Sequence, residues 1–443
     1  MLNVIKKIYT ALPCNRVSLL KYIPDQFLYG SRYQYIKNNI SISKSELGAR
    51  LLRQLTYTRN HTAFGKENIP KEIQIDEVFS VLEDVPEITS SDLAENIGYF
   101  KSDEYNKLNS YLTTTGGTGR NPTTILLSNE SYGVEWAHMI YIWENLGYVK
   151  KKHTKLTLRG KKVKGDKTFI YNPIYNEVVV DIFSLSSSNF KRHYQELIRK
   201  YKIDYIHGYP SLVKEYMSYL QENNLELKLK GVMLGSEGIG LQEKNEIADF
   251  FRCGVISWYG QSEKVILAAD FNQDGRFIVL TSYGYPRIVD ADINAIGEIA
   301  GTTFVNKALP LINYKTGDYG KLDCGQDRIE LQKIKGRWGK DYVYLNEEKK
   351  IPTSAINLHS NIQQEILFYQ IVQKEYGRLL VRILPKSESN LTDGEIQQRI
   401  VNELKEKLSG FTISSKVVKE SSEIVRSSRG KMMYLLQNLN TSK

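Results

Sequence analysis

The chain has 443 residues, more than one ordinary domain contains, so its length predicts two or three structural units. Hydrophobic residues make up 41% of the chain and charged residues 25%, a composition that excludes a disordered or fibrous protein. No apolar stretch approaches the roughly 18 residues of a membrane span, and the N-terminus does not read as a signal peptide. We therefore expect a cytoplasmic, globular enzyme.

Metal-binding and disulfide frameworks are not favoured either. The six histidines are scattered rather than paired at ligand spacings, and no CxxC pair occurs among the three cysteines, which are Cys14, Cys253 and Cys324.

The formal net charge of +10 raises the question of an anionic partner. Much of the excess lies in the stretch Lys150–Lys167, which contains Lys161, Lys162 and Lys164 but no aromatic residue that could stack on a base. We therefore expect no nucleic-acid partner. Two interpretations stay open: a solvated loop or hairpin, or contact with an anionic lipid, a cofactor or the phosphates of an acceptor.

The first hundred residues have the pattern of helices broken by turns, with apolar residues at helical spacing from Leu47 to Leu55. From Tyr111 onward, short β-rich runs alternate with helical stretches, which predicts an α/β sheet. The predicted strands are 123–127, 178–182, 205–206, 232–234 and 255–258, and the predicted helices are 191–202 and 241–251.

After about Leu280 the sequence becomes rich in strands, and Lys315–Asp318 has the composition of a turn. A helix is predicted over Asp393–Leu408 and a strand over Ile413–Val418. We expect a large domain, residues 1–336, and a small α+β domain, residues 337–443.

A glycine- and threonine-rich run at 113–122 carries the first chemical signal. Its glycines can turn backbone N–H groups inward, and its hydroxyl groups and Arg120 add donors that suit a polyphosphate. It does not match the Walker pattern, so an ordinary turn between two elements stays open for this run taken alone.

Later motifs follow this run in a fixed order. They are Gly235-Ser236-Glu237, Trp258-Tyr259-Gly260-Gln261-Ser262-Glu263, Tyr314-Lys315-Thr316-Gly317-Asp318, Gly336-Arg337 and Arg429-Gly430-Lys431. In this order they resemble the core motifs of the adenylate-forming superfamily of acyl-CoA synthetases, adenylation domains and luciferases. The resemblance runs from about residue 50 to the end. It is closer to the branch of phenylacetate–CoA ligase and the capsular-polysaccharide CapK-like proteins, on the stretches 205–211, 297–314 and 424–431.

This resemblance implies a fold and an activity. The fold would be a large, multi-layer α/β N-terminal domain with a small, mobile α+β C-terminal domain. The activity would be ATP-dependent activation of a carboxylic acid as acyl-AMP, with release of pyrophosphate, followed by acyl transfer to an acceptor. The alternative is a non-catalytic binding or scaffold member of the fold in a polysaccharide assembly system.

The resemblance also implies nucleotide-binding residues. The phosphate loop would comprise Thr113, Thr114, Thr115, Gly116, Gly117, Thr118 and Gly119. Gly235, Ser236 and Glu237 would contact adenine, with the ring of Tyr259 stacked on the base and with Gly260 and Ser262 beside it. Asp318 would accept hydrogen bonds from the ribose, and Glu263 would be the ligand of Mg²⁺.

Two basic residues complete the implied catalytic set. Arg337 would lie at the domain junction, although the sequence departs from the commoner Gly-Arg-x-x-Asp pattern there, which leaves the hinge residue open. Lys431 would enter the active site from the C-terminal domain and stabilise the transition state, and closure of that domain would exclude water from the acyl adenylate.

The acid and its acceptor are not named by the sequence. By resemblance, the acid pocket would be bordered by His207, Tyr209 and Pro210, with Tyr209 as an aromatic wall. The acceptor would be coenzyme A, a carrier thiol, or an amine or hydroxyl that includes sugar-linked groups, and surface polysaccharide biosynthesis is the setting that the CapK-like branch suggests. The oligomeric state also stays open.

Overall fold

The computed structural model describes residues 18–30, 32–114, 124–159, 163, 167–325, 328–335, 342–347, 349–352, 358, 362, 365–426 and 432–439. The chain forms two compact units. Unit 1 comprises residues 1–18, 150–253 and 337–443, and unit 2 comprises residues 19–149 and 254–336. The expected boundary between residues 336 and 337 stays a prediction.

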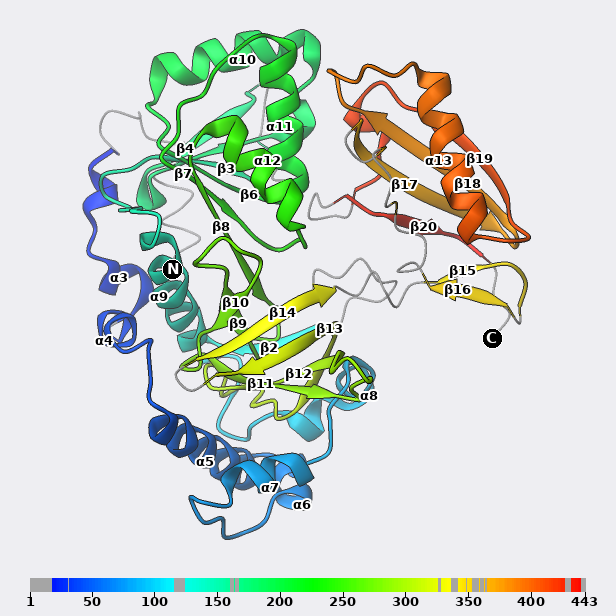
Figure 1. The fold of residues 1–443 in the computed structure, drawn as a ribbon. Helices are drawn as coiled ribbons and strands as arrows, with labels where there is room; N and C mark the ends of the chain where they lie inside the picture. Colours follow the sequence, from blue (N-terminus) through cyan, green and yellow to red (C-terminus); the bar gives the residue numbers. More distant parts are fainter. Residues whose placement is uncertain are drawn as a thin grey trace. The chain divides into compact units, whose positions relative to one another are not determined.

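Unit 2 begins with helices and continues with antiparallel strands (Figure 1). Its helices are α3 (Asp25–Tyr29), α4 (Tyr33–Asn38), α5 (Lys44–His61), α6 (Ala63–Asn68), α7 (Val78–Asp84), α8 (Ser90–Phe100) and α9 (Asn129–Glu144). Its strands are β1 (Ser110–Thr114), β2 (Thr124–Ser128), β8 (Gly254–Gly260), β9 (Leu267–Ala269), β10 (Phe277–Val279), β11 (Gly284–Val289), β12 (Gly297–Thr303), β13 (Tyr314–Cys324) and β14 (Ile329–Lys335).

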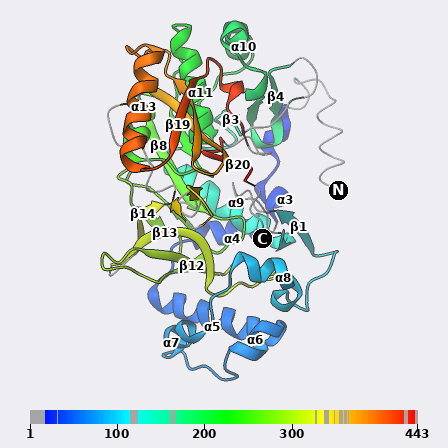
Figure 2. The ribbon, with the colours of Figure 1, turned by 90° about the vertical axis from the view of Figure 1, so that its right-hand side faces the viewer.

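The strands β8 to β14 form the main antiparallel sheet of unit 2, in the order β11-β12-β13-β14-β10-β9-β8. The strands β1 and β2 form a separate antiparallel hairpin. Figures 1 and 2 both show α5, α6 and α7 side by side. Leu51 and Leu55 of α5 are fully buried in the same apolar core as Val78 of α7 and Ile299 of β12, so the predicted helical spacing over 47–55 is confirmed.

Residues 150–253 of unit 1 form the α/β part of the fold. Its strands are β3 (Lys155–Leu158), β4 (Phe169–Asn172), β5 (Glu177–Val180), β6 (Tyr205–Gly208) and β7 (Gly231–Leu234), and its helices are α10 (Ser187–Lys200), α11 (Pro210–Glu222) and α12 (Leu241–Phe251). The strand order is β7-β6-β3-β5-β4, and every pair except β4 with β5 is parallel. The alternation of strands and helices therefore produces the predicted α/β sheet.

Residues 342–439 form the C-terminal part of unit 1. It contains β15 (Tyr342–Tyr344), β16 (Lys350–Pro352), β17 (Ile366–Glu375), β18 (Arg378–Pro385), α13 (Asp393–Lys407), β19 (Thr412–Val417) and β20 (Leu435–Gln437). Four strands form a sheet in the order β19-β18-β17-β20, and α13 packs against it (Figure 1). Ile396, Ile400 and Leu404, each four residues apart, bury one face of α13 in the core of this part.

Polar contacts join the C-terminal part to α11 within unit 1. The side chain of Arg426 forms an ion pair with Glu215, and the hydroxyl of Ser421 donates to the same carboxylate. Further along α11, the Gln221 amide donates to Glu388 at 2.6 Å. The contact thus includes an ion pair and hydrogen bonds as well as any apolar packing.

The structure corrects one local prediction. Lys315–Asp318 is not a turn but part of β13, and the register of β13 against β12 shifts at this point. Gly317 has a φ of 83°, so the strand contains an irregularity that a glycine accommodates without strain. No helix in the described part of the chain is long and apolar enough to span a bilayer.

Candidate functional site

One edge of the parallel sheet collects several of the predicted residues. In the sheet register, Leu158 of β3 pairs with Gly208 of β6, and Gly208 pairs with Leu234 of β7. The three strands therefore end level with one another at their carboxyl ends, the edge at which open α/β sheets bind ligands.

The residues predicted to border the acid pocket lie at this edge. His207, in β6, is 4% exposed, and Tyr209 and Pro210 start α11 and are also buried. Burial, reinforced by the charges of Arg159 and Lys155, holds the pKa of His207 well below its usual value, so the imidazole is neutral at physiological pH. The wall that these residues offer is uncharged and largely aromatic.

The predicted adenine contact follows β7. The backbone N–H of Gly235 donates to the carbonyl of Gly208 at 3.3 Å, which extends the strand pairing by one residue. Ser236 then has a φ of 70°, in the left-handed region, and redirects the chain. Glu237 accepts the N–H of Ser211 at 3.1 Å, in the first turn of α11, where a carboxylate suits the helix dipole.

Unit 2 brings together Tyr259 and Asp318. The hydroxyl of Tyr259, in β8, donates to Asp318 Oδ2 at 3.0 Å and lies 3.4 Å from Thr316 Oγ1. The Thr316 hydroxyl donates to the carbonyl of Ile299 at 2.8 Å and accepts the N–H of Asp318 at 3.1 Å. Burial and the nearby Asp318 carboxylate raise the pKa of Tyr259 well above its usual value, so this hydroxyl stays a donor.

Glu263 is buried in the same unit. Its side chain is 1% exposed, and its Oε1 accepts the hydroxyl of Tyr314 at 2.9 Å. Gly260 is the last residue of β8, and Ser262 lies between it and Glu263 with its side chain half-buried. The two motifs that contain Glu263 and Tyr314 thus meet although they are far apart in the sequence.

The hairpin β1–β2 flanks the predicted phosphate loop. Thr113 lies in β1 and pairs with Ile125, and the pair Thr114–Thr124 is the last described one before residues 115–123, which lie outside the described residues. The run predicted as a phosphate loop thus begins in strand β1 and is followed by strand β2. Asn306 anchors β2, because its Oδ1 accepts the N–H of Ser128 at 3.0 Å and its Nδ2 donates to the carbonyl of Leu126 at 2.9 Å.

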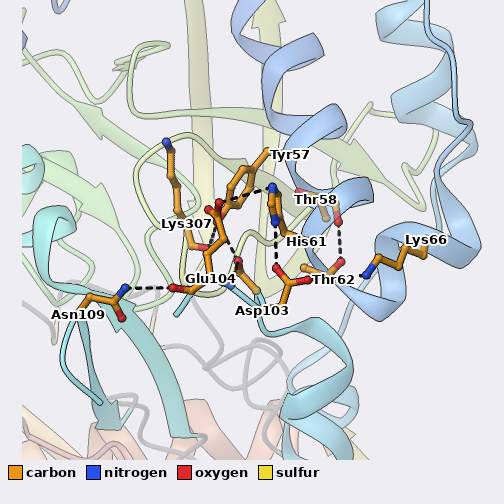
Figure 3. A network of polar contacts seen from close by, with 10 residues as sticks. Tyr57, Thr58, His61, Thr62, Lys66, Asp103, Glu104, Asn109 and Lys307 are labelled. Atoms are coloured by element: carbon orange, nitrogen blue, oxygen red, sulfur yellow. Dashed lines mark hydrogen bonds and ion pairs between the residues drawn. The ribbon is translucent and has the colours of Figure 1, made fainter. Parts of the chain in front are cut away.

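A polar network supports the base of this hairpin (Figure 3). The Tyr57 hydroxyl at the end of α5 donates to Glu104 Oε2 at 2.9 Å, and the Lys307 ammonium lies 5.4 Å from the centre of the Tyr57 ring. Asn109, which directly precedes β1, donates to the carbonyl of Glu104 at 3.1 Å. The hydrogen bond between His61 Nδ1 and Asp103 Oδ1, at 2.9 Å, ties α5 to the same segment. The network therefore fixes the start of β1.

Several predicted residues lie outside the described residues. They are Thr115, Gly116, Gly117, Thr118, Gly119, Lys161, Lys162, Lys164, Arg337 and Lys431, and the side chain of Thr114 is not described either. Arg426 and Met432, on either side of the segment that contains Lys431, form an antiparallel bridge.

The basic stretch Lys150–Lys167 is not uniformly solvated. Lys150 is 7% exposed, and Lys155, in β3, is 2% exposed and forms an ion pair with Glu177 at 3.3 Å. The expectation of a solvated loop or hairpin is wrong for these two residues, because both are buried. Lys155 lies in β3, an internal strand of the sheet, where Glu177 neutralises its charge.

Arg159 also lies at this edge, although no sequence motif indicated it. It directly follows β3 at the same edge as Tyr209 and Gly235, and its Nη2 donates to Ser236 Oγ at 3.3 Å. Its position directly after a short β-rich run could have indicated the end of a strand, but the neighbouring lysines made Arg159 resemble part of a charged surface segment.

Comparison with known proteins gives two curated relatives. The chain is 23% identical over 354 residues to protein CapK of Staphylococcus aureus, an alignment that covers 75% of this chain and 76% of that protein. It is 24% identical over 259 residues to phenylacetate-coenzyme A ligase of Pseudomonas putida, which covers 54% of this chain and 58% of the ligase. No protein-family model matches the chain.

Solved structures show the same fold. A 2-hydroxyisobutyryl-CoA ligase in the postadenylation state, in complex with R3-HIB-AMP, matches 88% of this chain and 89% of its own, with a TM-score of 0.63 and 14% identity. An acyl acid amido synthetase in complex with 2,4-DB matches 91% of this chain and 93% of its own, with a TM-score of 0.60 and 13% identity.

Proposed function

Since the chain belongs to the adenylate-forming superfamily of AMP-forming acid ligases, in the branch of CapK and phenylacetate–CoA ligase, we propose that it activates a carboxylic acid as acyl-AMP and transfers the acyl group to an acceptor. The observation that carries the proposal is the orientation of Asp318 by Tyr259 and Thr316 in a unit that also buries Glu263.

The residues of unit 2 fit a ribose. Asp318 is half-buried, and its position is fixed by one hydrogen bond to its carboxylate and one from its backbone N–H. An ionised carboxylate only accepts hydrogen bonds and has about four lone-pair sites, so Asp318 is the type of side chain that would accept from the hydroxyl groups of a ribose. On unit 1, Gly235, Ser236 and Glu237 would contact adenine.

The carboxylate of Glu263 fits Mg²⁺. No group of three or more histidine, cysteine, aspartate or glutamate side chains suited to a metal occurs in the described ranges. Mg²⁺ is commonly held by one or two carboxylates together with substrate phosphates, so a single buried glutamate is an adequate protein ligand. When bound, Mg²⁺ would neutralise charge on the phosphates of ATP.

The proposed first step joins the acid to AMP. A carboxylate oxygen of the acid attacks the α-phosphorus of ATP, and the bond from that phosphorus to the oxygen of the leaving pyrophosphate breaks. The chain's contribution is positioning and charge stabilisation. His207, neutral and buried, together with Tyr209 and Pro210, would line the acid pocket, whereas Lys431 and Arg337 would supply positive charge.

The second step is acyl transfer. The acceptor is proposed to be coenzyme A, a carrier thiol, or a sugar-linked amine or hydroxyl, and the similarity to CapK supports a role in surface polysaccharide biosynthesis. The acceptor's nucleophilic atom attacks the acyl carbonyl carbon, and AMP leaves with the electrons of the broken C–O bond.

ATP–pyrophosphate exchange across a panel of aromatic, branched, hydroxy and amino acids tests the first step. We expect at least one acid to support exchange. Glu263→Gln retains the shape of the side chain and an oxygen for Tyr314 but removes the charge, so we expect exchange to fall about a hundredfold, on the order of 3 kcal/mol. Lys431→Ala is expected to lower it at least as much.

The matched control is Glu83→Gln, which removes an exposed carboxylate at the end of α7 and should leave the exchange rate unchanged. The absence of exchange with every acid would count against the proposed function. An undiminished rate in Glu263→Gln would exclude Glu263 as the metal ligand.

A further inference from the structure

Arg159 occupies a position that the proposed reaction does not yet use. Leu158, Gly208 and Leu234 are aligned across β3, β6 and β7, and the residues that follow them are Arg159, Tyr209 and Gly235. Arg159 therefore lies at the ligand-binding edge of the sheet by topology, not as part of a charged surface loop.

Its side chain is held between two residues of the candidate site. The Nη2 atom donates to Ser236 Oγ at 3.3 Å, and the guanidinium carbon lies 5.4 Å from the centre of the Tyr209 ring. Tyr209 is itself fixed, because it is 5% exposed and its backbone N–H donates to the carbonyl of Leu158 at 3.0 Å. These contacts orient the planar guanidinium before any ligand arrives.

The charge of Arg159 is not neutralised by the described residues. No aspartate or glutamate described in the structure forms an ion pair with Arg159, whereas Lys155, four residues earlier, is paired with Glu177. Glu237, in the loop that contains Ser236, turns one carboxylate oxygen to the N–H of Ser211 in α11. The positive charge also contributes to the low pKa of His207, so the neighbouring imidazole stays neutral.

The geometry points to Arg159 as the residue that binds an oxyanion of a substrate at the junction of the acid pocket and the nucleotide. A guanidinium has five N–H donors in a planar fork that matches a carboxylate or a phosphate, and Ser236 uses only one of them. The ligand is the carboxylate of the acid or the phosphate of AMP, and this inference rests on the proposed function for the identity of those two substrates.

Equilibrium binding separates the two sources. Wild type, Arg159→Gln and Arg159→Lys are titrated calorimetrically with AMP and adenosine, and with benzoate and benzamide as an anionic and a neutral probe. If the phosphate is the ligand, Arg159→Gln lowers the affinity for AMP at least tenfold and leaves the affinity for adenosine unchanged. If the carboxylate is the ligand, Arg159→Gln lowers the affinity for benzoate and leaves the affinity for benzamide unchanged. Arg159→Lys keeps the charge but loses the planar fork of donors, so its affinity for the anionic ligand is expected to lie between those of wild type and Arg159→Gln.

The same variants are assayed by pyrophosphate exchange. A rise in KM for the acid alone identifies the carboxylate as the ligand of Arg159, and a rise in KM for ATP alone identifies the phosphate. Arg199→Gln, which removes an exposed arginine near the end of α10, serves as the matched control. Thermal unfolding midpoints should be equal in all variants, since Arg159 is exposed.

The inference is overturned if the affinities of Arg159→Gln for AMP and benzoate, and its KM values, stay within twofold of wild type. Its failure is distinct from failure of the proposed function, because a wild-type protein without exchange activity can still show Arg159-dependent binding of AMP or benzoate.

Discussion

The Tyr259 hydroxyl group is a donor with two oxygen atoms within reach, Asp318 Oδ2 at 3.0 Å and Thr316 Oγ1 at 3.4 Å. Because burial keeps it protonated, it always donates, and the negatively charged carboxylate is the stronger acceptor. Thr316 meanwhile directs its proton to the carbonyl of Ile299. The hydroxyl groups of Tyr259 and Thr316 thus each have a defined direction, and the Tyr259 hydroxyl orients the Asp318 carboxylate.

Tyr259→Phe tests this orientation. The change removes one hydrogen bond to a charged group, a contribution of about 1.5–3 kcal/mol, so we expect the affinity for AMP to fall about tenfold. Isothermal titration calorimetry measures it. Tyr105→Phe removes a comparable hydroxyl, bonded to Glu130 at 2.8 Å, and should leave AMP binding unchanged. Equal affinity in Tyr259→Phe and wild type would contradict the assigned role.

At this scale, sequence motifs predicted Tyr259, Glu263 and Asp318 but not the residues that orient them. Tyr314 meets Glu263, and Thr316 meets Tyr259, only because β13 packs in the same unit as β8 and the Glu263 segment, more than 50 residues away in the chain. Such partners depend on sheet order, and a linear motif does not contain that information.

The hairpin β1–β2 has its own supports. Asn306 binds two backbone groups at the end of β2, and the network of Tyr57, His61, Asp103 and Glu104 holds the segment before β1 (Figure 3). Both strands that enter and leave residues 115–123 are therefore attached to the body of unit 2 by side chains.

Asn306→Ala is expected to lower the free energy of unfolding by about 2–4 kcal/mol, because the buried N–H of Ser128 and the carbonyl of Leu126 both lose their partner. Chemical denaturation followed by tryptophan fluorescence reports it, since Trp136, Trp143 and Trp258 lie in unit 2. Asn272→Ala, at an exposed position of the same unit, is the control and should unfold like wild type. A loss in Asn306→Ala no larger than in the control would show that β2 does not depend on it.

At the scale of elements, most predictions were confirmed. The helix over 241–251 has the predicted bounds, and the helix over 393–408 and the strands over 205–206, 232–234 and 255–258 are present with small shifts. Two features were not predictable from local composition. The irregularity at Gly317 has the residues of a turn but stays in a strand, and Lys155 occupies a buried strand because Glu177 lies beside it in β5.

Among the described residues, three histidines are buried within their own units and carry no charge at neutral pH. Burial lowers the pKa of His138 and of His193 to about 4 and that of His207 well below its usual value. In the unfolded chain a histidine titrates near pH 6.5, so between that value and the folded pKa the unfolded state binds protons that the folded state does not. Stability is therefore lost as the pH falls below about 6.5.

We expect the thermal unfolding midpoint to drop between pH 7.5 and pH 5, because each of these histidines lowers the free energy of unfolding by about 2 kcal/mol at pH 5. His138→Asn removes one titrating group, so the drop in the variant should be smaller than in wild type. Differential scanning calorimetry at the two pH values checks this. An identical drop in the variant would mean that His138 does not resist protonation in the folded protein.

The division of the chain into its two structural units was the feature least predictable from the sequence. Length indicated two or three units, and the motif order indicated a fold, but each unit takes residues from separate stretches of the chain. That pattern arises from contacts over long sequence separations, such as that of Arg426 with Glu215, and local periodicity does not encode them.

The interleaving has a consequence for protein synthesis. Because a ribosome makes the chain from the N-terminus, residues 150–253 emerge before residues 254–336, which complete unit 2, and residues 337–443 emerge last. The face of α11 that contacts the C-terminal part is therefore exposed to water until that part has been synthesised. Its groups there, Glu215 and Gln221, are ones that water solvates well. The Glu215 carboxylate and the Gln221 amide stay hydrated until their partners Arg426 and Glu388 have been made.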